Sequence, residues 1–180
     1  QAWIQTWTFF ETIHARSYMH IIRNLYSNPS KVFDEIVFDE QLMKRAASIT
    51  ERYDKLIDLA HKHELIKDKP EEFTDEFIWS IHKDLYLCMH TINALEAIRF
   101  YASFITTFNF QETRGVMEGN VKIMKFIARD ENLHNQGTRY IIEQWHSGKE
   151  GQIWLDVAEA SRQEATEIFN KVRQEEKERA

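Results

Sequence analysis

Hydrophobic residues recur at helical spacing from the start of the chain. An α-helix turns by about 100° per residue, so residues at this spacing lie on one face of a helix, within an arc of about 100°. The residues on this face are Trp3, Ile4, Trp7, Glu11, His14, Tyr18, Ile21, Ile22 and Leu25. The turn YSNPSK ends this helix, and a short helix over 31–36 is predicted to follow, with Ser30 as its cap. The pattern predicts a long first helix whose buried apolar face also carries a carboxylate, an imidazole and a phenol.

In the rest of the chain, segments with hydrophobic residues at helical spacing are separated by short polar connections. A second long helix is predicted over 40–65, and Thr74 is expected to cap the helix that follows the charged segment IKDKPEEFTDE. The aromatic and β-branched run FYASFITTFNF is expected to distort the C-terminal half of that helix. The later helices are predicted over 75–110, 116–145 and 152–178. With only five glycines and two prolines, the chain is expected to form a single all-α domain.

Composition narrows the classes of partner. A formal net charge of −6 argues against a general affinity for nucleic acid or for an anionic membrane. No apolar run reaches the roughly 18 residues of a membrane span, and the single Cys88 fits a reducing cytoplasm. We therefore expect a soluble cytoplasmic protein. Because Gln1 stands inside a helical pattern and is not a methionine, the sequence is expected to be an excerpt of a longer one.

Two Glu-x-x-His pairs lie within apolar stripes, that is, rows of hydrophobic residues along one face of a predicted helix. Glu131 and His134 in ARDENLH repeat the spacing of Glu11 and His14, and residues three apart are neighbours on one helix face. Glu96 in NALEAIRF is a further carboxylate within an apolar stripe. Two such pairs with single carboxylates from other helices are typical of dinuclear sites in ferritin-like bundles. These oxygen and nitrogen ligands suit iron or manganese.

Each of these features also has a simpler interpretation. A buried Glu or His taken alone is more often a hydrogen-bonded core residue than a ligand, and Glu143 and His146 have the same spacing. Glu143 lies about 120° around the helix from Glu131, away from the apolar stripe, so we expect that pair to be solvated. Two pairs and Glu96 in apolar stripes together favour metal binding.

The phenol of Tyr18 follows His14 by one helical turn on the same face. A buried tyrosine is usually a packing residue with a satisfied hydroxyl. Beside an oxygen-activating dinuclear site, Tyr18 is instead a candidate for oxidation to a radical. Phe100, Phe104 and Ile127 are then candidates for an apolar wall around it, or simply core residues.

Three blocks of the sequence resemble a known family. WIQTWTFFETIHARSY, NALEAIRFYASF and MEGNVKIMKFIARDENLH closely resemble the small, radical-generating subunit of class I ribonucleotide reductase, especially the enterobacterial and T-even-phage type. The blocks occur in order, and the similarity covers nearly the whole chain. The resemblance implies a ferritin-like, ribonucleotide-reductase-like helical bundle, here incomplete, with residues 1–180 as a partial di-iron domain.

The resemblance also implies roles for individual residues. It makes Tyr18 the radical-bearing tyrosine and Asp130 the aspartate that hydrogen-bonds a histidine ligand and belongs to the radical-transfer route. Without it, Asp130 reads as a surface or capping charge. Phe100, Phe104 and Ile127 match the hydrophobic pocket around the tyrosine. The implied iron ligands are Glu11, His14, Glu96, Glu131 and His134.

The family's activity and partners follow as expectations. Two iron ions per subunit and O2 oxidise the tyrosine, and the radical passes to the large subunit, where a ribonucleotide is reduced. The same ligands also serve manganese. The subunit is commonly a homodimer, in the cytoplasm or, for a phage protein, in the host cytoplasm. The family's first ligand, an aspartate on the preceding helix, is not in this sequence, and neither are an upstream tryptophan and the C-terminal tail that binds the large subunit.

Two other functions compete with this one. The first is another di-iron oxidase of ferritin-like architecture that acts on an external substrate. The second is a truncated, non-catalytic bundle that serves as an assembly partner of an intact subunit. Metal analysis separates the second from the other two, since a well-folded protein without tight metal favours the non-catalytic role.

Overall fold

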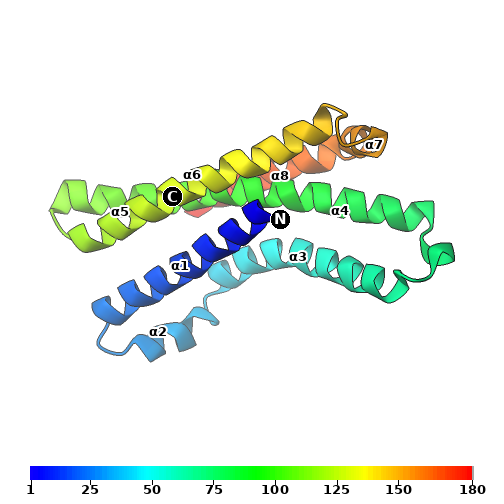
Figure 1. The fold of residues 1–180 in the computed structure, drawn as a ribbon. Coiled ribbons are helices and arrows are strands. Elements are labelled where there is room, and N and C mark those ends of the chain that lie inside the picture. The colour runs from blue at the N-terminus through cyan, green and yellow to red at the C-terminus, as the bar shows by residue number, and fades with distance from the viewer. Residues whose placement is uncertain (180) are drawn as a thin grey trace. The chain divides into compact units, whose positions relative to one another are not determined.

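Helices account for all the regular structure of residues 1–179, the part of the chain that the computed structural model describes (Figure 1). No strand occurs in this range, so the all-α prediction is confirmed. The elements in order are α1 (Ala2–Leu25), α2 (Pro29–Ile36), α3 (Glu40–Ile66), a 3₁₀ turn (Pro70–Glu72), α4 (Asp75–Ala94), a π-helical turn (Leu95–Phe100), α5 (Tyr101–Arg114), α6 (Glu118–His146), α7 (Gln152–Ala160) and α8 (Arg162–Arg179).

One predicted N-cap is confirmed and the other is wrong. The Thr74 hydroxyl accepts the backbone N–H of Phe77 at 3.2 Å and caps α4, as expected. α2 is capped by Asn28, whose side chain accepts from the backbone N–H of residue 31 at 3.4 Å, and Ser30 lies inside the helix. Pro29 explains the difference, because proline has no N–H to satisfy and its fixed φ suits the first position of a helix.

The predicted distortion of the helix over 75–110 is a π-helical turn. It covers Leu95–Phe100 and therefore lies earlier than most of the aromatic run that suggested it. A π turn inserts an extra residue into the helical repeat and is often found at functional sites. Glu96 lies within this turn.

The predicted last helix over 152–178 is two helices. Ser161 separates α7 from α8 with φ −101° and ψ 5°, outside the regular helical range, and its N–H still bonds the carbonyl of Val157. Apolar periodicity continues through the break, so the sequence pattern did not reveal it.

The chain forms two compact units. The first unit contains residues 1–46 and 100–134, and the second contains 47–99 and 135–180. In the first unit, α5 and the N-terminal half of α6 form a hairpin at Gly115, whose φ of +63° favours glycine. Its core holds Phe104, Met124 and Ile127, and partly buried side chains such as Phe100 pack against them.

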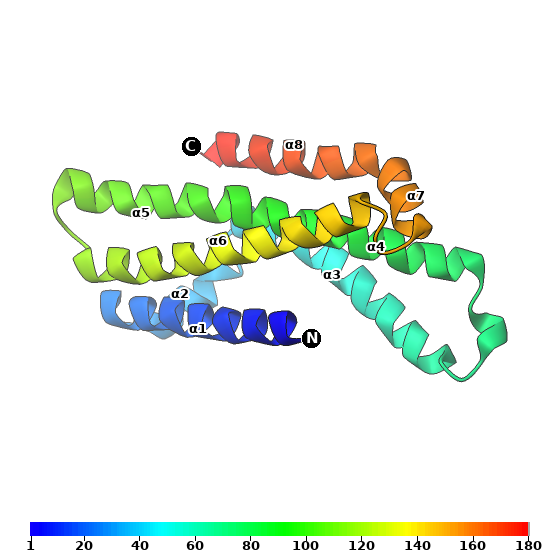
Figure 2. The same cartoon turned by 45° about the horizontal axis from the view of Figure 1, so that its top comes forward.

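The second unit is built around α4. This helix packs against α7 and α8, and Figures 1 and 2 both show α8 running beside it. The indole rings of Trp145 and Trp154 stack with centroids 4.1 Å apart and planes 4° apart. The fully buried members of this core include Leu87 and Val157.

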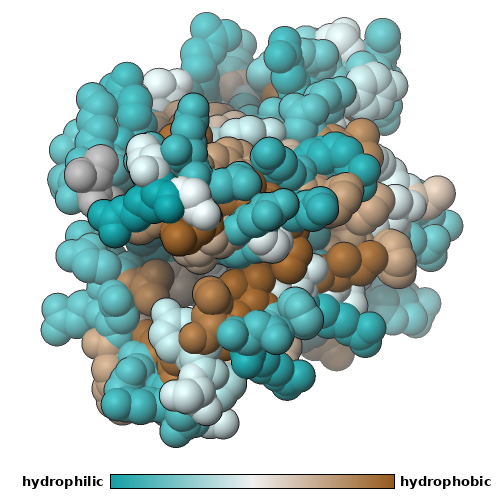
Figure 3. All heavy atoms as spheres, turned by 90° about the vertical axis from the view of Figure 1, so that its left-hand side faces the viewer, coloured by the Kyte–Doolittle hydropathy of each residue, from teal (hydrophilic) through white to brown (hydrophobic). Residues whose placement is uncertain are grey.

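Large apolar side chains reach the surface of the first unit. Figure 3 shows brown hydrophobic groups among teal hydrophilic ones on the face that contains the α1–α2 and α5–α6 connections. Exposed side chains in these segments include Leu25, Tyr26, Phe110 and Val116, which are 41–54% exposed. None of the helices within residues 1–179 is both long and apolar enough to cross a membrane.

Candidate metal centre

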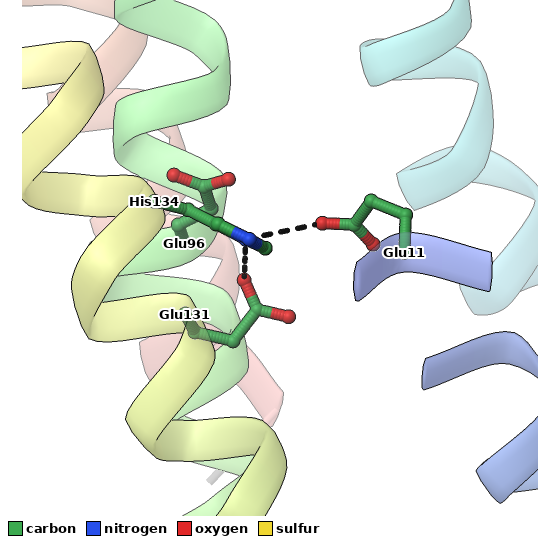
Figure 4. A group of neighbouring side chains, drawn as sticks. All are labelled: Glu11, Glu96, Glu131 and His134. Atoms are coloured by element: carbon green, nitrogen blue, oxygen red, sulfur yellow. Dashed lines mark hydrogen bonds and ion pairs between the residues drawn. The ribbon is translucent and has the colours of Figure 1, made fainter. Parts of the chain in front are cut away.

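The two Glu-x-x-His pairs meet in the first unit. His14 Nδ1 lies 3.2 Å from Glu131 Oε1, and His134 Nδ1 lies 3.2 Å from Glu11 Oε1. Within the pairs, His134 is 3.3 Å from Glu131 and His14 is 3.7 Å from Glu11. Figure 4 shows the Glu11 and Glu131 carboxylates converging on His134. Each imidazole therefore contacts the carboxylate of its own helix and that of the other helix.

These groups form a potential ligand set. Glu11, Glu131 and His134 each offer one ligand atom, and these atoms lie within 4.8 Å of one another. A separation of this size is short enough for one ion to draw the atoms into a common coordination sphere. The first unit thus contains a Glu/His cluster that is able to hold a metal ion.

Burial within this cluster is uneven. His14, Glu131 and His134 are at most 3% exposed, whereas the Glu11 side chain is 46% exposed. The expectation that Glu11 is buried is therefore wrong. The covered sector of α1 is centred near His14, and Glu11 lies about 60° around the helix from it, toward the exposed side.

Carboxylates set the charge of His14. Burial by itself lowers the pKa of this imidazole, but hydrogen bonds to Glu11, Glu131 and Asp130 outweigh burial and raise the pKa to about 10. The partial burial of Glu11 raises its pKa, yet hydrogen bonds from His134, His14 and Trp7 lower it to about 2. Without a metal, a protonated His14 offsets part of the negative charge of the surrounding carboxylates.

Asp130 contacts the opposite side of the His14 ring. Its Oδ2 lies 3.3 Å from His14 Nε2, and its Oδ1 accepts hydrogen bonds from the Arg129 guanidinium at 3.1 and 3.2 Å. Because one ring nitrogen faces Asp130, the other is directed toward Glu131. Such a carboxylate fixes the ring orientation of an imidazole ligand. The residues alone favour a surface or capping charge for Asp130, and only the resemblance pointed to its contact with a histidine.

Trp7 is a residue whose role the sequence analysis missed. Its indole N–H donates to Glu11 Oε1 at 3.1 Å, and its ring centroid lies 5.2 Å from that of His134. Phe10 approaches the same imidazole at 5.9 Å. The i,i+4 spacing of Trp7 and Glu11 was a usable signal, because such residues are neighbours on a helix.

Tyr18 is more exposed than the sequence predicted. It is 40% exposed, and it lies about 40° around α1 from His14, again toward the open side. The burial of part of its ring and the charges of Glu131 and Glu11 raise the pKa of its phenol to about 12. The side chain is therefore a protonated phenol at neutral pH, electrostatically coupled to the carboxylates.

The three residues predicted to wall in Tyr18 share the core of the first unit. Phe104 and Ile127 are 1% and 2% exposed, and Phe100 packs against them with its ring centroid 6.2 Å from that of Phe104. They form an apolar cluster, and their role as a wall around Tyr18 stays a prediction.

Glu96 belongs to the second unit. It is 2% exposed and lies in the π-helical turn after α4. Figure 4 also draws this side chain. A carboxylate this deeply buried requires compensating partners. Its assignment as a metal ligand stays a prediction.

Glu143 and His146, the other pair with Glu-x-x-His spacing, are both exposed, as predicted. Glu143 pairs with Arg139 at 2.9 Å on the exposed face of α6. His146 is exposed but is bonded to the buried Tyr86 hydroxyl, with 2.9 Å between Nε2 and the oxygen. The pair with metal-like spacing is therefore split between a surface ion pair and a hydrogen bond to the core of the second unit.

Sequence comparisons identify relatives of the whole chain. The family model described as "Ribonucleotide reductase, small chain" matches residues 1–179. The chain is 54% identical, over 97% of its length, to the ribonucleoside-diphosphate reductase subunit beta of Enterobacteria phage T4. It is 46% identical to the subunit beta of Haemophilus influenzae and 44% identical to the reductase 1 subunit beta of Escherichia coli O157:H7, over 98% of its length in both cases. It spans 48% of the length of each of these relatives. The chain belongs to the ribonucleotide reductase small-chain family.

Proposed function

We propose that this chain acts as part of the small, β subunit of a ribonucleoside-diphosphate reductase and contributes to a dinuclear iron site. The proposed ligands are Glu11, His14, Glu96, Glu131 and His134. The observation that carries the proposal is the reciprocal contact between the two Glu-x-x-His pairs, with His14 against Glu131 and His134 against Glu11, both at 3.2 Å. The names of the relatives give the chemistry to which such a site would belong.

The donor set fits such a centre. Two carboxylates and two imidazoles of the first unit converge, and three of these four residues are nearly fully buried. Carboxylate oxygens and imidazole nitrogens are suitable ligands for iron and manganese, and buried charges of this kind require a partner. Metal binding would displace the proton from His14, since only the neutral imidazole is a ligand.

The residues around the ligands have distinct tasks in this proposal. When bound, the iron centre supplies, with O2, the oxidising power that removes an electron from Tyr18. The Tyr18 phenol is protonated at neutral pH, so its oxidation to a neutral radical would release a proton together with that electron. Asp130 holds the His14 ring by its Nε2 and leaves Nδ1 directed toward Glu131. The apolar cluster of Phe100, Phe104 and Ile127 would limit the access of water to the radical.

The proposal extends to the partners of the subunit. The Tyr18 radical would pass to a large subunit, which would use it to reduce ribonucleoside diphosphates to deoxyribonucleotides, with Asp130 on the transfer route. The working form would be a homodimer in the cytoplasm of a cell or of a phage-infected host. The names of the relatives, each a subunit beta, support a large-subunit partner.

Ferrous iron and oxygen test the proposal directly. The metal-free chain is mixed with Fe(II) under nitrogen, and bound iron is counted before O2 is admitted. We expect about two iron ions per chain and a tyrosyl signal in the electron paramagnetic resonance spectrum. The signal should vanish in Tyr18→Phe and persist in Tyr140→Phe, a control at a tyrosine that is 61% exposed on α6. An unchanged signal in Tyr18→Phe would refute the radical assignment, and folded protein without tight iron would favour the non-catalytic assembly role.

The exposure of Glu11 favours a second candidate function. A ligand that is 46% exposed leaves the cluster open to molecules from solution, as an oxidase acting on an external substrate requires. Such an oxidase would consume O2 in proportion to an added organic substrate, and Tyr18→Phe would leave that consumption unchanged. A reductase subunit would consume O2 only in proportion to the iron supplied.

A further inference from the structure

A cavity in the second unit contains a group of polar side chains that the proposed function does not use. It has a volume of about 220 Å³ and lies among α4, the end of α6 and the first turns of α8. Its polar groups are two hydroxyls, two imidazoles and one guanidinium, and no carboxylate lines it. The lining residues are Tyr86, His90, His146, Arg162, Ala165, Thr166 and Phe169. The chain as a whole has a net charge of −6, but this cavity is lined by a guanidinium and by no carboxylate. The local charge therefore favours an anionic ligand.

Arg162 is the permanent charge of this cavity. Its guanidinium makes no hydrogen bond or ion pair with any side chain in the described part of the chain, although acidic residues outnumber basic ones 29 to 23. Its charge reaches Tyr86: burial raises the pKa of that phenol, and Arg162 opposes the rise. An arginine in this position is available for a charge-assisted, two-pronged hydrogen bond to an oxyanion.

Tyr86 and His146 form a hydrogen-bonded pair at the edge of the cavity. The Tyr86 hydroxyl and His146 Nε2 are 2.9 Å apart, and Tyr86 is 2% exposed whereas His146 is exposed. The buried phenol thus holds the imidazole at the end of α6 against the cavity. His146 has its second nitrogen left for solvent or a ligand.

The opposite side of the cavity is aromatic. The His90 ring lies edge-on to Tyr86 at 4.6 Å and to Phe169 at 6.0 Å, and neither of its nitrogens has a hydrogen-bond partner. Burial and the neighbouring His146 lower the pKa of His90 to about 4. At neutral pH the ring is uncharged, so it offers a flat wall and not a second cation.

We propose that this cavity binds a small organic anion, with its carboxylate or phosphate group at Arg162 and His146 and its flat apolar body against His90 and Phe169. A neighbouring cavity of about 510 Å³ shares Tyr86, His146 and Arg162 but is also lined by two acidic residues, Asp156 and Glu159. Those carboxylates disfavour an anion there, so the smaller cavity is the site.

Four probes separate the contributions of charge and of the apolar body: benzoate, phenyl phosphate, neutral benzamide and inorganic phosphate. Binding to the metal-free chain is measured by titration calorimetry, and contact is located from the side-chain NMR signals of His90 and His146. We expect benzoate or phenyl phosphate to bind one per chain and to shift both histidine signals. Benzamide should bind at least about tenfold more weakly, because it lacks the charge that Arg162 recognises. Inorganic phosphate should also bind more weakly than phenyl phosphate, because it lacks the flat body.

Arg162→Gln provides the decisive variant. We expect it to weaken benzoate binding about fivefold or more, whereas Arg173→Gln, at an exposed arginine of the same helix, leaves binding unchanged. Far-UV circular dichroism checks that both variants are folded. The proposal is overturned if neither organic anion binds, if benzamide binds as tightly as benzoate, or if the two arginine variants weaken binding equally. Because no metal is added, these outcomes are independent of the iron site.

Discussion

His14 in the first unit and His90 in the second are both shielded imidazoles, yet at neutral pH His14 is a cation and His90 is uncharged. His14 lies among the carboxylates of Glu11, Asp130 and Glu131, and its pKa is about 10. His90 lies among aromatic rings near His146, and its pKa is about 4. Burial lowers the pKa of both. The partners therefore decide whether a buried histidine is a cation or a neutral ring.

The same contrast extends to the cores of the two units. The first unit contains a cluster of ionisable groups besides a small apolar core, and the second unit packs stacked indoles and aliphatic side chains. Buried charges are costly unless paired, whereas buried apolar groups need no partner. We therefore expect the stability of the first unit to depend on ions and that of the second to depend on packing.

The largest effect is expected from Glu131→Ala. It removes the carboxylate that contacts both His14 and His134, so we expect the free energy of unfolding of the metal-free protein to fall by about 3–5 kcal/mol. Iron affinity should fall at least about a hundredfold, since even residues that only orient ligands contribute ten- to hundredfold. Denaturant unfolding and iron titration measure the two effects. Glu143→Ala, an exposed glutamate of the same helix, should change stability by at most about 0.5 kcal/mol. Equal losses in the two variants would contradict the role of the cluster.

Trp145→Ala should cost a similar amount through packing alone. Trp145 is 7% exposed and stacked on Trp154, and truncation of a buried aromatic ring typically costs about 3–5 kcal/mol. The stabilisation gained on adding Fe(II), measured as the shift in unfolding free energy with and without iron, should equal that of the unsubstituted protein. A Trp145→Ala protein that no longer gains stability from iron would show that Trp145 contributes to the ligand cluster and not to packing alone.

His90 should make the protein less stable in acid. Its folded pKa of about 4 lies below its ordinary value of 6.5, so between these values the unfolded chain binds more protons and the free energy of unfolding falls as pH falls. The contribution is at most about 1.4 kcal/mol per pH unit. Denaturant unfolding from pH 7 to pH 4 should show a shallower decline in His90→Gln, while His20→Gln, at an exposed histidine, keeps the original slope. The same slope in both variants would mean that His90 has the same pKa in the folded and the unfolded protein.

The smallest effect is expected from Thr74→Ala at the start of α4. Loss of the 3.2 Å bond to the Phe77 N–H should lower the free energy of unfolding by about 1 kcal/mol. Thr106→Ala, whose hydroxyl bonds only a carbonyl of its own helix, should be nearly neutral. A larger loss of unfolding free energy in Thr106→Ala than in Thr74→Ala would contradict a stabilising role of the Thr74 cap.

Much of the helical framework could be predicted from periodicity. The all-α, ferritin-like fold class is confirmed by the helices and by the family match. The start of α4 at Thr74 followed from its capping chemistry. The break at Ser161 did not, because the apolar periodicity continues through it, and a hydrophobic pattern records which side of a helix is buried but not a change in backbone path. A distortion of the helix over 75–110 was predicted, but its π-helical form and its position at Leu95–Phe100 were not.

The chain's local spacing determined which side chains share a helix face. It placed Glu11 beside His14 and Glu131 beside His134, because residues three apart are neighbours in any α-helix. Only the tertiary structure decided that each imidazole contacts the carboxylate of the other pair, that Asp130 reaches His14, and that Glu11 stands at the solvent edge. These outcomes depend on how two helices rotate and slide when they pack. That choice is made by contacts between residues more than a hundred positions apart, which no local pattern encodes.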